Sequence, residues 1–311
     1  MSSKLEQVLS LASSRGILQS PDFIKTTHKK PYEAISPTRP EVSQAGRTVL
    51  VTGGNSGIGY AAAQAFGRAG ASRVIITGRR PAATAEAAAA LSSSGTTEFV
   101  GTTCDMAKPD AIDGLWADLA GRGAVVDVLV LNAARISESE GILERGVEAV
   151  WADYDVNLRA QLHMAEKFYK QQKPAPAAAG RPKFLVMVST AAIHEWAVND
   201  AYPSYGLSKN AGTLAMQLLA RATAPDDMQI VSYHPGAVFT DSARKVGIKE
   251  DSWDWTDANL PGQFAVWAAS TQASFLHGRY VWSEWDINEL KALQERLEKD
   301  ENFLRIGVHG F

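Results

Sequence analysis

The chain has 311 residues, 45% of them hydrophobic, so it is long enough to bury one substantial core. Its formal net charge of −3 argues against binding to nucleic acid, because such proteins usually carry a basic excess. Cys104 is the only cysteine, which excludes intrachain disulfides and argues against a zinc cluster. No apolar run is long enough to cross a bilayer and no secretory signal pattern is present, so we expect a cytoplasmic protein without a metal site.

The first part of the chain differs in character from the rest. Residues 1–45 are polar and interrupted by Pro21, Pro31, Pro37 and Pro40, without the periodicity of a strand or a long helix. We expect this N-terminal extension to run over the surface of the following domain. The catalytic domain is predicted over residues 46–285, and a C-terminal helix and tail over residues 286–311.

From Arg47 onward, apolar runs alternate with helical patterns. Continuous apolar strands separated by helices predict a parallel sheet covered on both faces, which is a doubly wound α/β fold of the Rossmann type. Ligands of such sheets bind at the carboxyl ends of the strands. The seven predicted strands are 49–51, 74–77, 99–102, 125–131, 184–188, 230–233 and 280–282.

The first strand leads into spaced glycines (VLVTGGNSGIG, residues 49–59) and then into a predicted helix over residues 60–69. This order is typical of a dinucleotide site. Gly53 permits a tight turn, Gly57 allows close approach of a pyrophosphate, and Gly59 lets the helix pack against the strand. Because the spacing G-x-x-x-G-x-G is wider than the common fingerprint, a structural glycine turn in another α/β protein is the alternative.

The choice of cofactor is predicted from the end of the second strand. NAD sites place an acidic residue about 20 residues beyond the last glycine, against the ribose 2′-hydroxyl. Here the sequence is Gly78-Arg79-Arg80, and two guanidinium groups without a carboxylate favour the 2′-phosphate of NADP. A solvated basic turn is the alternative.

Tyr205 and Lys209 are four residues apart, so both side chains project from one face of a helix. A free phenol loses its proton only near pH 10, and a nearby ammonium group favours the phenolate. The pair is therefore a candidate for acid-base catalysis, although most such pairs lie on a solvated helix face.

These motifs make residues 45–285 resemble the short-chain dehydrogenase/reductase family. Six segments match the family in its order: the loop 52–59, Asp105 after the third strand, Asn132-Ala133 after the fourth, Asn157, the pair Tyr205 and Lys209, and residues 235–240. The resemblance implies that residues 235–240 hold the nicotinamide amide. The resemblance implies that the cofactor contacts Gly53, Asn55, Ser56, Gly57, Ile58, Gly59, Arg79, Arg80, Asp105, Met106, Asn132, Ala133, Tyr205, Lys209, Pro235, Gly236, Val238 and Thr240. The proline-rich start and the closing segment 285–290 also resemble a fungal subgroup linked to secondary metabolism.

The resemblance also implies the catalytic roles. Tyr205 would exchange the proton, Lys209 would lower the pKa of Tyr205 and hold the nicotinamide ribose, and Asn157 would hold a relay water. The family's hydroxyl at the end of the fifth strand falls on Thr190, with Ser189 as the second candidate. Strand alternation should point these two hydroxyls to opposite faces of the sheet. The 15 residues from Thr190 to Tyr205 are more than is usual in the family, so an insertion is predicted around residues 194–196.

The sequence also supports predictions for three further segments. A substrate loop is predicted over about residues 241–265. It includes the segment 246–265, whose Trp253 and Trp255 either line a substrate pocket or pack a subdomain. Residues 173–182 read as an exposed connection. Asp286 is expected to cap a final helix whose apolar stripe is formed by Ile287, Leu290, Leu293 and Leu297.

We therefore predict an NADP-dependent oxidoreductase that interconverts a ketone and a secondary alcohol on a bulky apolar small molecule. Two alternatives stay open: a non-redox enzyme on the same scaffold, performing isomerisation, dehydration or cyclisation, and an NADP-binding regulatory protein. The expected partners are a small-molecule substrate and further copies of the chain in a homodimer or homotetramer, with no nucleic acid and no membrane.

Overall fold

The computed structural model describes residues 21–92, 95–137, 140–171, 181–240, 244 and 249–307. At its centre is one seven-stranded sheet in the order β3-β2-β1-β4-β5-β6-β7. Every neighbouring pair is parallel, which confirms the predicted doubly wound fold. The strands are β1 (Thr48–Val51), β2 (Arg73–Gly78), β3 (Glu98–Thr103), β4 (Val128–Leu131), β5 (Lys183–Val188), β6 (Gln229–His234) and β7 (Arg279–Trp282).

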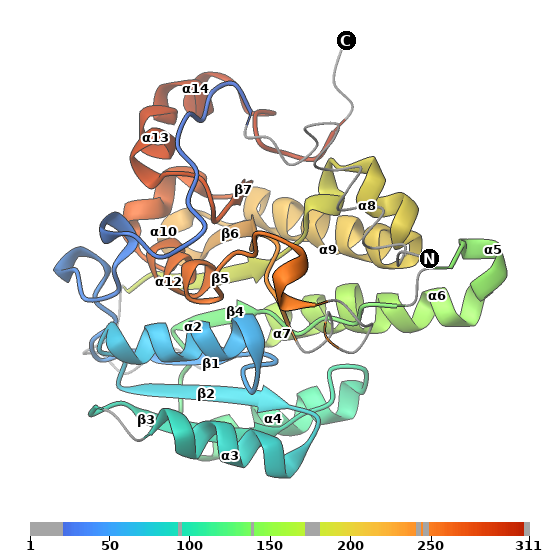
Figure 1. Ribbon diagram of the computed structural model, residues 1–311. Helices are drawn as coiled ribbons and strands as arrows, with labels where there is room; N and C mark the ends of the chain where they lie inside the picture. The colour runs from blue at the N-terminus through green and yellow to red at the C-terminus, as the bar shows by residue number, and fades with distance from the viewer. Residues whose placement is uncertain are drawn as a thin grey trace.

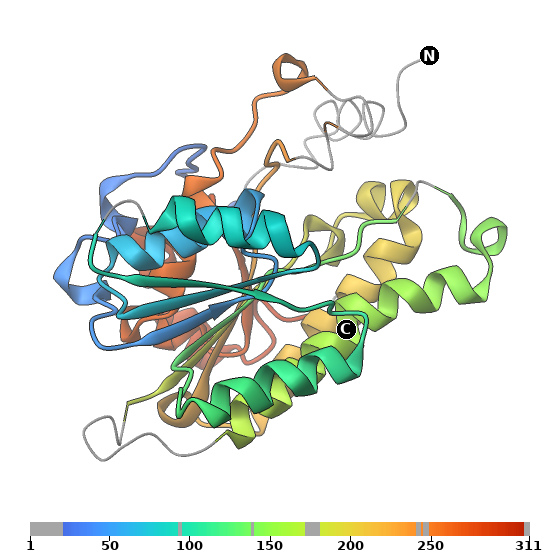
Figure 2. The same cartoon turned by 90° about the horizontal axis from the view of Figure 1, so that it is seen from below.

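Helices cover both faces of this sheet, as Figures 1 and 2 show. One face carries α2 (Gly57–Arg68), α3 (Pro81–Leu91) and α12 (Asn259–Ala268). The other carries α4 (Pro109–Gly121), α7 (Ala160–Lys170) and α9 (Pro203–Arg221). The other α-helices within the described residues are α5 (Ile142–Arg145), α6 (Val147–Tyr154), α8 (Trp196–Ala201), α10 (Pro225–Met228), α13 (Ile287–Ala292) and α14 (Gln294–Lys299).

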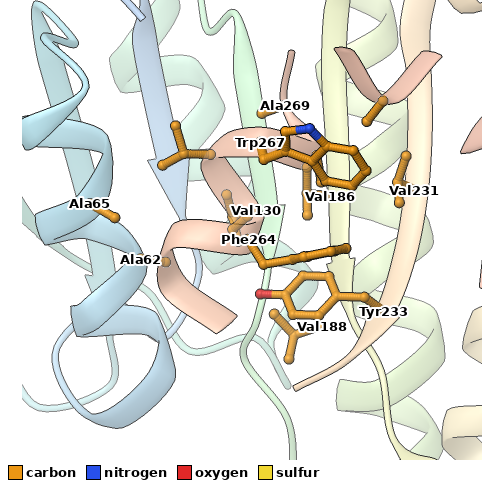
Figure 3. Close-up of a cluster of buried hydrophobic side chains, with 14 of the residues drawn as sticks. Ala62, Ala65, Val130, Val186, Val188, Val231, Tyr233, Phe264, Trp267 and Ala269 are labelled. Carbon is orange, nitrogen blue, oxygen red and sulfur yellow. The ribbon is translucent and has the colours of Figure 1, made fainter. Parts of the chain in front are cut away.

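Strand alternation divides the core into two layers. In β1, Val49 and Val51 join the cluster beneath α2 and α12, whereas Leu50 joins the cluster beneath α4, α7 and α9. All three side chains are fully buried, because a parallel sheet covered on both faces leaves neither side exposed. Figure 3 shows the first layer, where Phe264 and Trp267 of α12 lie against strand valines.

The fourth strand begins later than predicted. It starts at Val128 rather than at residue 125, because the Gln171 side chain takes both backbone groups of Val126. The Val126 amide donates to Gln171 Oε1, and Gln171 Nε2 donates to the Val126 carbonyl, each at 2.8 Å. Val126 therefore cannot pair with a neighbouring strand.

The described part of the N-terminal extension is anchored in the core by a few buried side chains, while most of its residues are exposed or partly buried. Ile24, Ile35 and Val42 are at most 3% exposed and belong to the same cluster as α2 and α12. The Phe23 ring packs edge-on against Trp285, with 5.8 Å between ring centroids. In Figure 1 this blue segment passes beside the red C-terminal helices.

The predicted loop 241–265 is only partly a loop, because α12 begins at Asn259. From Leu260 to Ala268 every residue of this helix is buried. A Cβ atom at Gly262 would lie 2.7 Å from the backbone of Ala61, so this glycine permits the contact between α12 and α2. The continuous apolar run is thus a core helix rather than a loop over the cofactor end of the sheet.

The C-terminal stripe has the expected burial but is divided between two short helices. Asp286 Oδ1 accepts from the amides of Asn288 and Glu289, at 2.8 and 3.3 Å, which confirms the cap. The helical run is interrupted at Leu293, between α13 and α14.

Of the predicted connection 173–182, residues 173–180 lie outside the described residues. None of the helices in the described ranges has the length and apolar character needed to span a bilayer.

Candidate active site

The turn between β1 and α2 has the backbone geometry that a bound phosphate needs. Gly53 and Gly57 have φ angles of +64° and +53°, a region that favours glycine. A Cβ atom at Gly59 would lie 2.3 Å from the Gly53 carbonyl oxygen, so Gly59 packs the helix against the turn. The helix starts at Gly57, three residues earlier than predicted, and Ser56 and Gly57 are exposed. Its first amides therefore face the turn, where they fit a pyrophosphate.

Thr52 and Asn132 hold this turn in place. The Thr52 hydroxyl accepts from the amides of Asn132 and Ala133, at 2.9 and 3.0 Å. Asn132 Nδ2 donates to the carbonyls of Thr52 and Gly53, at 2.9 and 3.2 Å. Asn132 is a predicted cofactor contact. In the structure its side-chain amide joins the end of β4 to the glycine turn. Sequence reasoning gave Thr52 no separate role, although it lies within the quoted motif.

Arg79 and Arg80 lie at the carboxyl end of β2, where the ribose of the adenosine half would bind in such a sheet. Both side chains are exposed, and neither forms an ion pair with another residue of the described part of the chain. A Cβ atom at Gly78 would lie 2.9 Å from Asn55 Cγ, so the Asn55 side chain rests on the end of β2. The structure therefore brings Asn55 and the two arginines together.

Asp105 and Met106 follow β3, the strand next to β2. Asp105 Oδ1 accepts from the Ala107 amide at 3.1 Å, which fixes the carboxylate at the strand end. Met106 is 7% exposed and belongs to the core cluster beneath α4. Asp105 is thus placed at the expected edge, whereas the Met106 side chain mainly packs.

The segment after β6 crosses toward the start of α2. Gly236 has a φ angle of +82°. Farther along, Thr240 Cγ2 lies 3.7 Å from where a Cβ atom of Gly57 would stand. Pro235, just before Gly236, is buried, and Val238, between Gly236 and Thr240, is partly buried. Trp255 packs on the Phe239 ring of this segment, with 5.4 Å between ring centroids.

Tyr205, Lys209 and Thr190 meet at the carboxyl end of β5. Tyr205 and Lys209 lie in the first turns of α9, and the side chains of Tyr205 and Thr190 are hydrogen-bonded. Lys209 is 1% exposed, and its Nζ donates to the Val188 carbonyl at 2.7 Å. Two hydroxyls and one amine, from the end of β5 and from α9, are therefore gathered in one place.

The two candidate hydroxyls after β5 point to different surroundings. The oxygens of the Ser189 and Thr213 hydroxyls are 2.6 Å apart in a buried contact with α9. Thr190 instead reaches Tyr205, and its carbonyl accepts from the Tyr280 hydroxyl at 2.8 Å. Only the Thr190 hydroxyl contacts the catalytic tyrosine candidate.

Burial shifts the pKa values of both helix residues. It raises the pKa of Tyr205, and the hydrogen bond with Thr190 opposes that shift. It lowers the pKa of Lys209 from 10.5 to about 7. Burial thus weakens the ammonium charge that should favour the Tyr205 phenolate.

This Lys209 pKa predicts a pH dependence of stability. Unfolded protein binds the lysine proton more tightly between pH 7 and 10.5, so the free energy of unfolding should rise with pH in that range. The slope from this one group is at most about 1.4 kcal/mol per pH unit. Urea unfolding at pH 7, 8 and 9 should show that Lys209→Met lacks this rise. Lys167→Met, which removes an ammonium group with 38% side-chain exposure, should keep it, and parallel curves for Lys209→Met and wild type would contradict the prediction.

Asn157 lies in a π-helical turn, Asp155–Arg159, between α6 and α7. Such turns are frequent at functional sites. Asn157 Oδ1 accepts from the Arg135 amide at 2.9 Å, while Nδ2 donates to the Arg135 carbonyl and to Ser208 Oγ at 2.8 and 2.9 Å. Both amide hydrogens are therefore used to join the segment after β4 to α9, beside Lys209. A relay water would have to bind a remaining acceptor of Asn157.

Asp153 is a site-supporting residue that sequence reasoning missed. Its carboxylate is completely buried, accepts from Ser204 Oγ at 2.5 Å and lies 2.9 Å from Arg135 Nε. Since Ser204 precedes Tyr205, this paired carboxylate fixes the start of α9. Nothing in the local sequence marks it, because its partners lie 18 and 51 residues away.

The predicted insertion after Thr190 forms a short helical turn and then α8. His194 Nε2 lies 3.4 Å from Glu195 Oε1. Burial lowers the pKa of His194 to about 4 and raises that of Glu195 to about 7. Trp196 is 79% exposed at the start of α8. The inserted segment thus adds a neutral imidazole, a weakly acidic carboxyl and an exposed indole after the β5 end.

Comparison with known proteins agrees with this geometry. Residues 47–251 match the short chain dehydrogenase family. The chain is 37% identical to the short chain dehydrogenase/reductase AacuD of Aspergillus aculeatus over 288 residues, covering 91% of this chain and 95% of the relative. It is 36% identical to a short chain dehydrogenase/reductase of Claviceps purpurea over 290 residues, covering 91% and 93%. A solved 3-oxoacyl (acyl-carrier-protein) reductase from Agrobacterium tumefaciens C58, with NADP bound, has a similar fold, with a TM-score of 0.66 and 24% identity over 78% of this chain and 96% of that chain.

The parallel sheet, the glycine turn and the tyrosine-lysine pair define an enzyme of the dinucleotide-dependent class. Within that class, the chain belongs to the short-chain dehydrogenase/reductase family. It is thus an NAD(P)-dependent oxidoreductase by family, and the predicted resemblance, including that to fungal members, is confirmed.

Proposed function

We propose that this enzyme uses NADP to interconvert a ketone and a secondary alcohol. The observation that carries the proposal is the meeting of the Tyr205 hydroxyl, the Thr190 hydroxyl and the Lys209 amine at the end of β5. This edge of the sheet also holds the glycine turn, because β1, β4 and β5 are consecutive parallel neighbours. The strand ends are where ligands of such sheets bind.

Each residue has a role in this proposal. When bound, the nicotinamide supplies or accepts the hydride. Tyr205 exchanges the proton of the substrate oxygen, and Thr190 donates a hydrogen bond to that oxygen. Lys209 supports the phenolate with its charge and holds the nicotinamide ribose. Asn157 keeps the relay path in place beside α9.

The function is tested by following NADPH absorbance with ketones of increasing size. Oxidation of NADPH in step with alcohol formation is expected. Product formed without any change in absorbance would favour a non-redox enzyme on this scaffold. NADPH binding without turnover of any substrate would favour the regulatory alternative, although a sensor has no need of the proton-relay residues.

The substrate is proposed to be a bulky apolar small molecule, as in fungal secondary metabolism, handled in the cytoplasm. The exposed indole of Trp196 and the partly buried Trp255 support this choice. Trp255 rests on Phe239 of the segment after β6, so packing and substrate contact are compatible roles for it.

The preference for NADP is proposed from the exposed Arg79 and Arg80. Arg79→Asp removes one phosphate partner and adds a carboxylate that repels the 2′-phosphate and accepts from a 2′-hydroxyl. We expect the ratio of kcat/KM for NADPH to that for NADH to fall roughly 100-fold, since the lost charged contact and the added repulsion each correspond to about one power of ten. A ratio already below one in the wild type would contradict the arginine argument.

A homodimer or homotetramer is proposed through α9 and the helices around Asn157. These helices expose apolar side chains, namely Leu162, Tyr169, Leu207, Leu214 and Leu218. Light scattering should give twice or four times the chain mass of 33.4 kDa. Leu218→Glu places a charge on a side chain that is 58% exposed in the single chain and should shift the protein toward smaller species. A wild-type monomer would contradict this proposal.

A further inference from the structure

The N-terminal extension is joined to two segments beside the cofactor end of the sheet. Thr27 forms an antiparallel bridge with Trp285, just after β7. The His28 amide donates to the Glu284 carbonyl at 2.7 Å, and the Asp257 amide donates to the Lys29 carbonyl at 2.8 Å. Residues 27–29 therefore lie between the end of β7 and the segment that leads into α12.

Glu284 is a buried carboxylate at this junction. It is 5% exposed, and its Oε1 accepts from Lys29 Nζ at 2.7 Å and from Thr256 Oγ1 at 2.6 Å. A buried carboxylate is costly unless it is paired and hydrogen-bonded. Lys29 supplies the opposite charge and Thr256 supplies a hydrogen bond, so the stable burial of Glu284 depends on both residues.

This carboxylate lies directly against the segment that follows β6. A Cβ atom at Gly236 would be 2.5 Å from Thr256 Oγ1 and 2.9 Å from Glu284 Cδ. The Thr256 amide also donates to the Ala237 carbonyl at 2.7 Å. The Gly236 backbone and the Ala237 carbonyl thus rest on the bonded pair of Glu284 and Thr256. Movement of Glu284 would release the backbone of residues 236–237.

We propose that Glu284, with Lys29 of the N-terminal extension as its cation, is a positioning residue for the nicotinamide half of the cofactor. It acts through Thr256, which holds the segment 235–240. The N-terminal extension then contributes to the cofactor site through Lys29. This inference rests on the proposed NADP-dependent function, because it assigns a task to the segment expected to hold the nicotinamide amide.

Titration calorimetry of the full-length protein with two ligands tests the proposal. NADP⁺ spans both halves of the site, whereas 2′,5′-ADP carries only the adenosine half with its 2′-phosphate. Thr256→Val deletes the link without changing shape, and Lys29→Met removes the counter-charge. Each should weaken NADP⁺ binding about tenfold, the effect of one lost hydrogen bond to a charged group, and leave 2′,5′-ADP binding within about twofold.

Two further variants separate positioning from general stability. Lys29→Arg keeps the cation and should restore NADP⁺ affinity. Lys167→Met breaks another lysine-carboxylate pair, with 2.6 Å to Asp113, and should leave both ligands unaffected. Unchanged NADP⁺ binding in both Thr256→Val and Lys29→Met, or an equal loss for the two ligands, would overturn this proposal alone. A wild-type protein that binds neither ligand would overturn it together with the proposed cofactor.

Discussion

Replacement of Tyr205 by phenylalanine is expected to abolish measurable turnover while NADPH binding stays nearly intact. The Tyr205 phenol is hydrogen-bonded to the Thr190 side chain, and positioned proton transfer contributes about 10²- to 10⁴-fold to rate. Under the proposed function, the glycine turn and the strand ends hold most of the cofactor, and this substitution does not touch them. The measurements are kcat with a ketone substrate and the Kd for NADPH by fluorescence titration.

A second tyrosine provides the matched control. Tyr202 lies at the start of the same helix, three positions before Tyr205, and is also partly buried. Tyr202→Phe removes a phenol from this neighbourhood and should keep kcat within about twofold. If Tyr205→Phe turned over at a near-normal rate, the proton-transfer role proposed for Tyr205 would be wrong.

The fold was predictable because its signals are local. A buried parallel strand is a short apolar run, and glycines spaced after the first run indicate the phosphate turn. The errors in element boundaries came from distant side chains. Gln171 removes Val126 from the fourth strand, and the apolar run of α12 reads as a core helix only when α2 is seen beneath it.

The candidate site also contains some features that the local sequence predicts and others that depend on contacts between distant residues. Tyr205 and Lys209 are neighbours on one helix, so their spacing predicts that they act together. Lys29 and Glu284 are 255 residues apart in sequence, and no pattern along the chain connects them. The lowered pKa of Lys209 could not be predicted from the sequence either, because it depends on complete burial rather than on residue type.

Strand alternation and side-chain contacts together distinguish Ser189 from Thr190. Alternation along an extended chain predicts that adjacent side chains face opposite ways, but it does not say which of them faces the substrate. In the structure, Ser189 pairs with Thr213 in the interface with α9 and Thr190 bonds Tyr205, which favours Thr190 as the catalytic candidate. The Tyr280 hydroxyl further fixes the backbone of Thr190.

Thr190→Val should therefore lower kcat by about 100-fold or more, the usual effect of losing one donor to a developing oxyanion. Valine keeps the shape of threonine, and Tyr280 still holds the backbone carbonyl, so the local fold should survive. Ser189→Ala removes only a buried hydroxyl contact, which should cost about 1 kcal/mol of stability and little activity. Steady-state kinetics of both variants, with urea unfolding as the stability measure, gives the ranking. The reverse ranking would move the catalytic role to Ser189, and two mild effects would mean that the reaction does not depend on a hydroxyl at the end of β5.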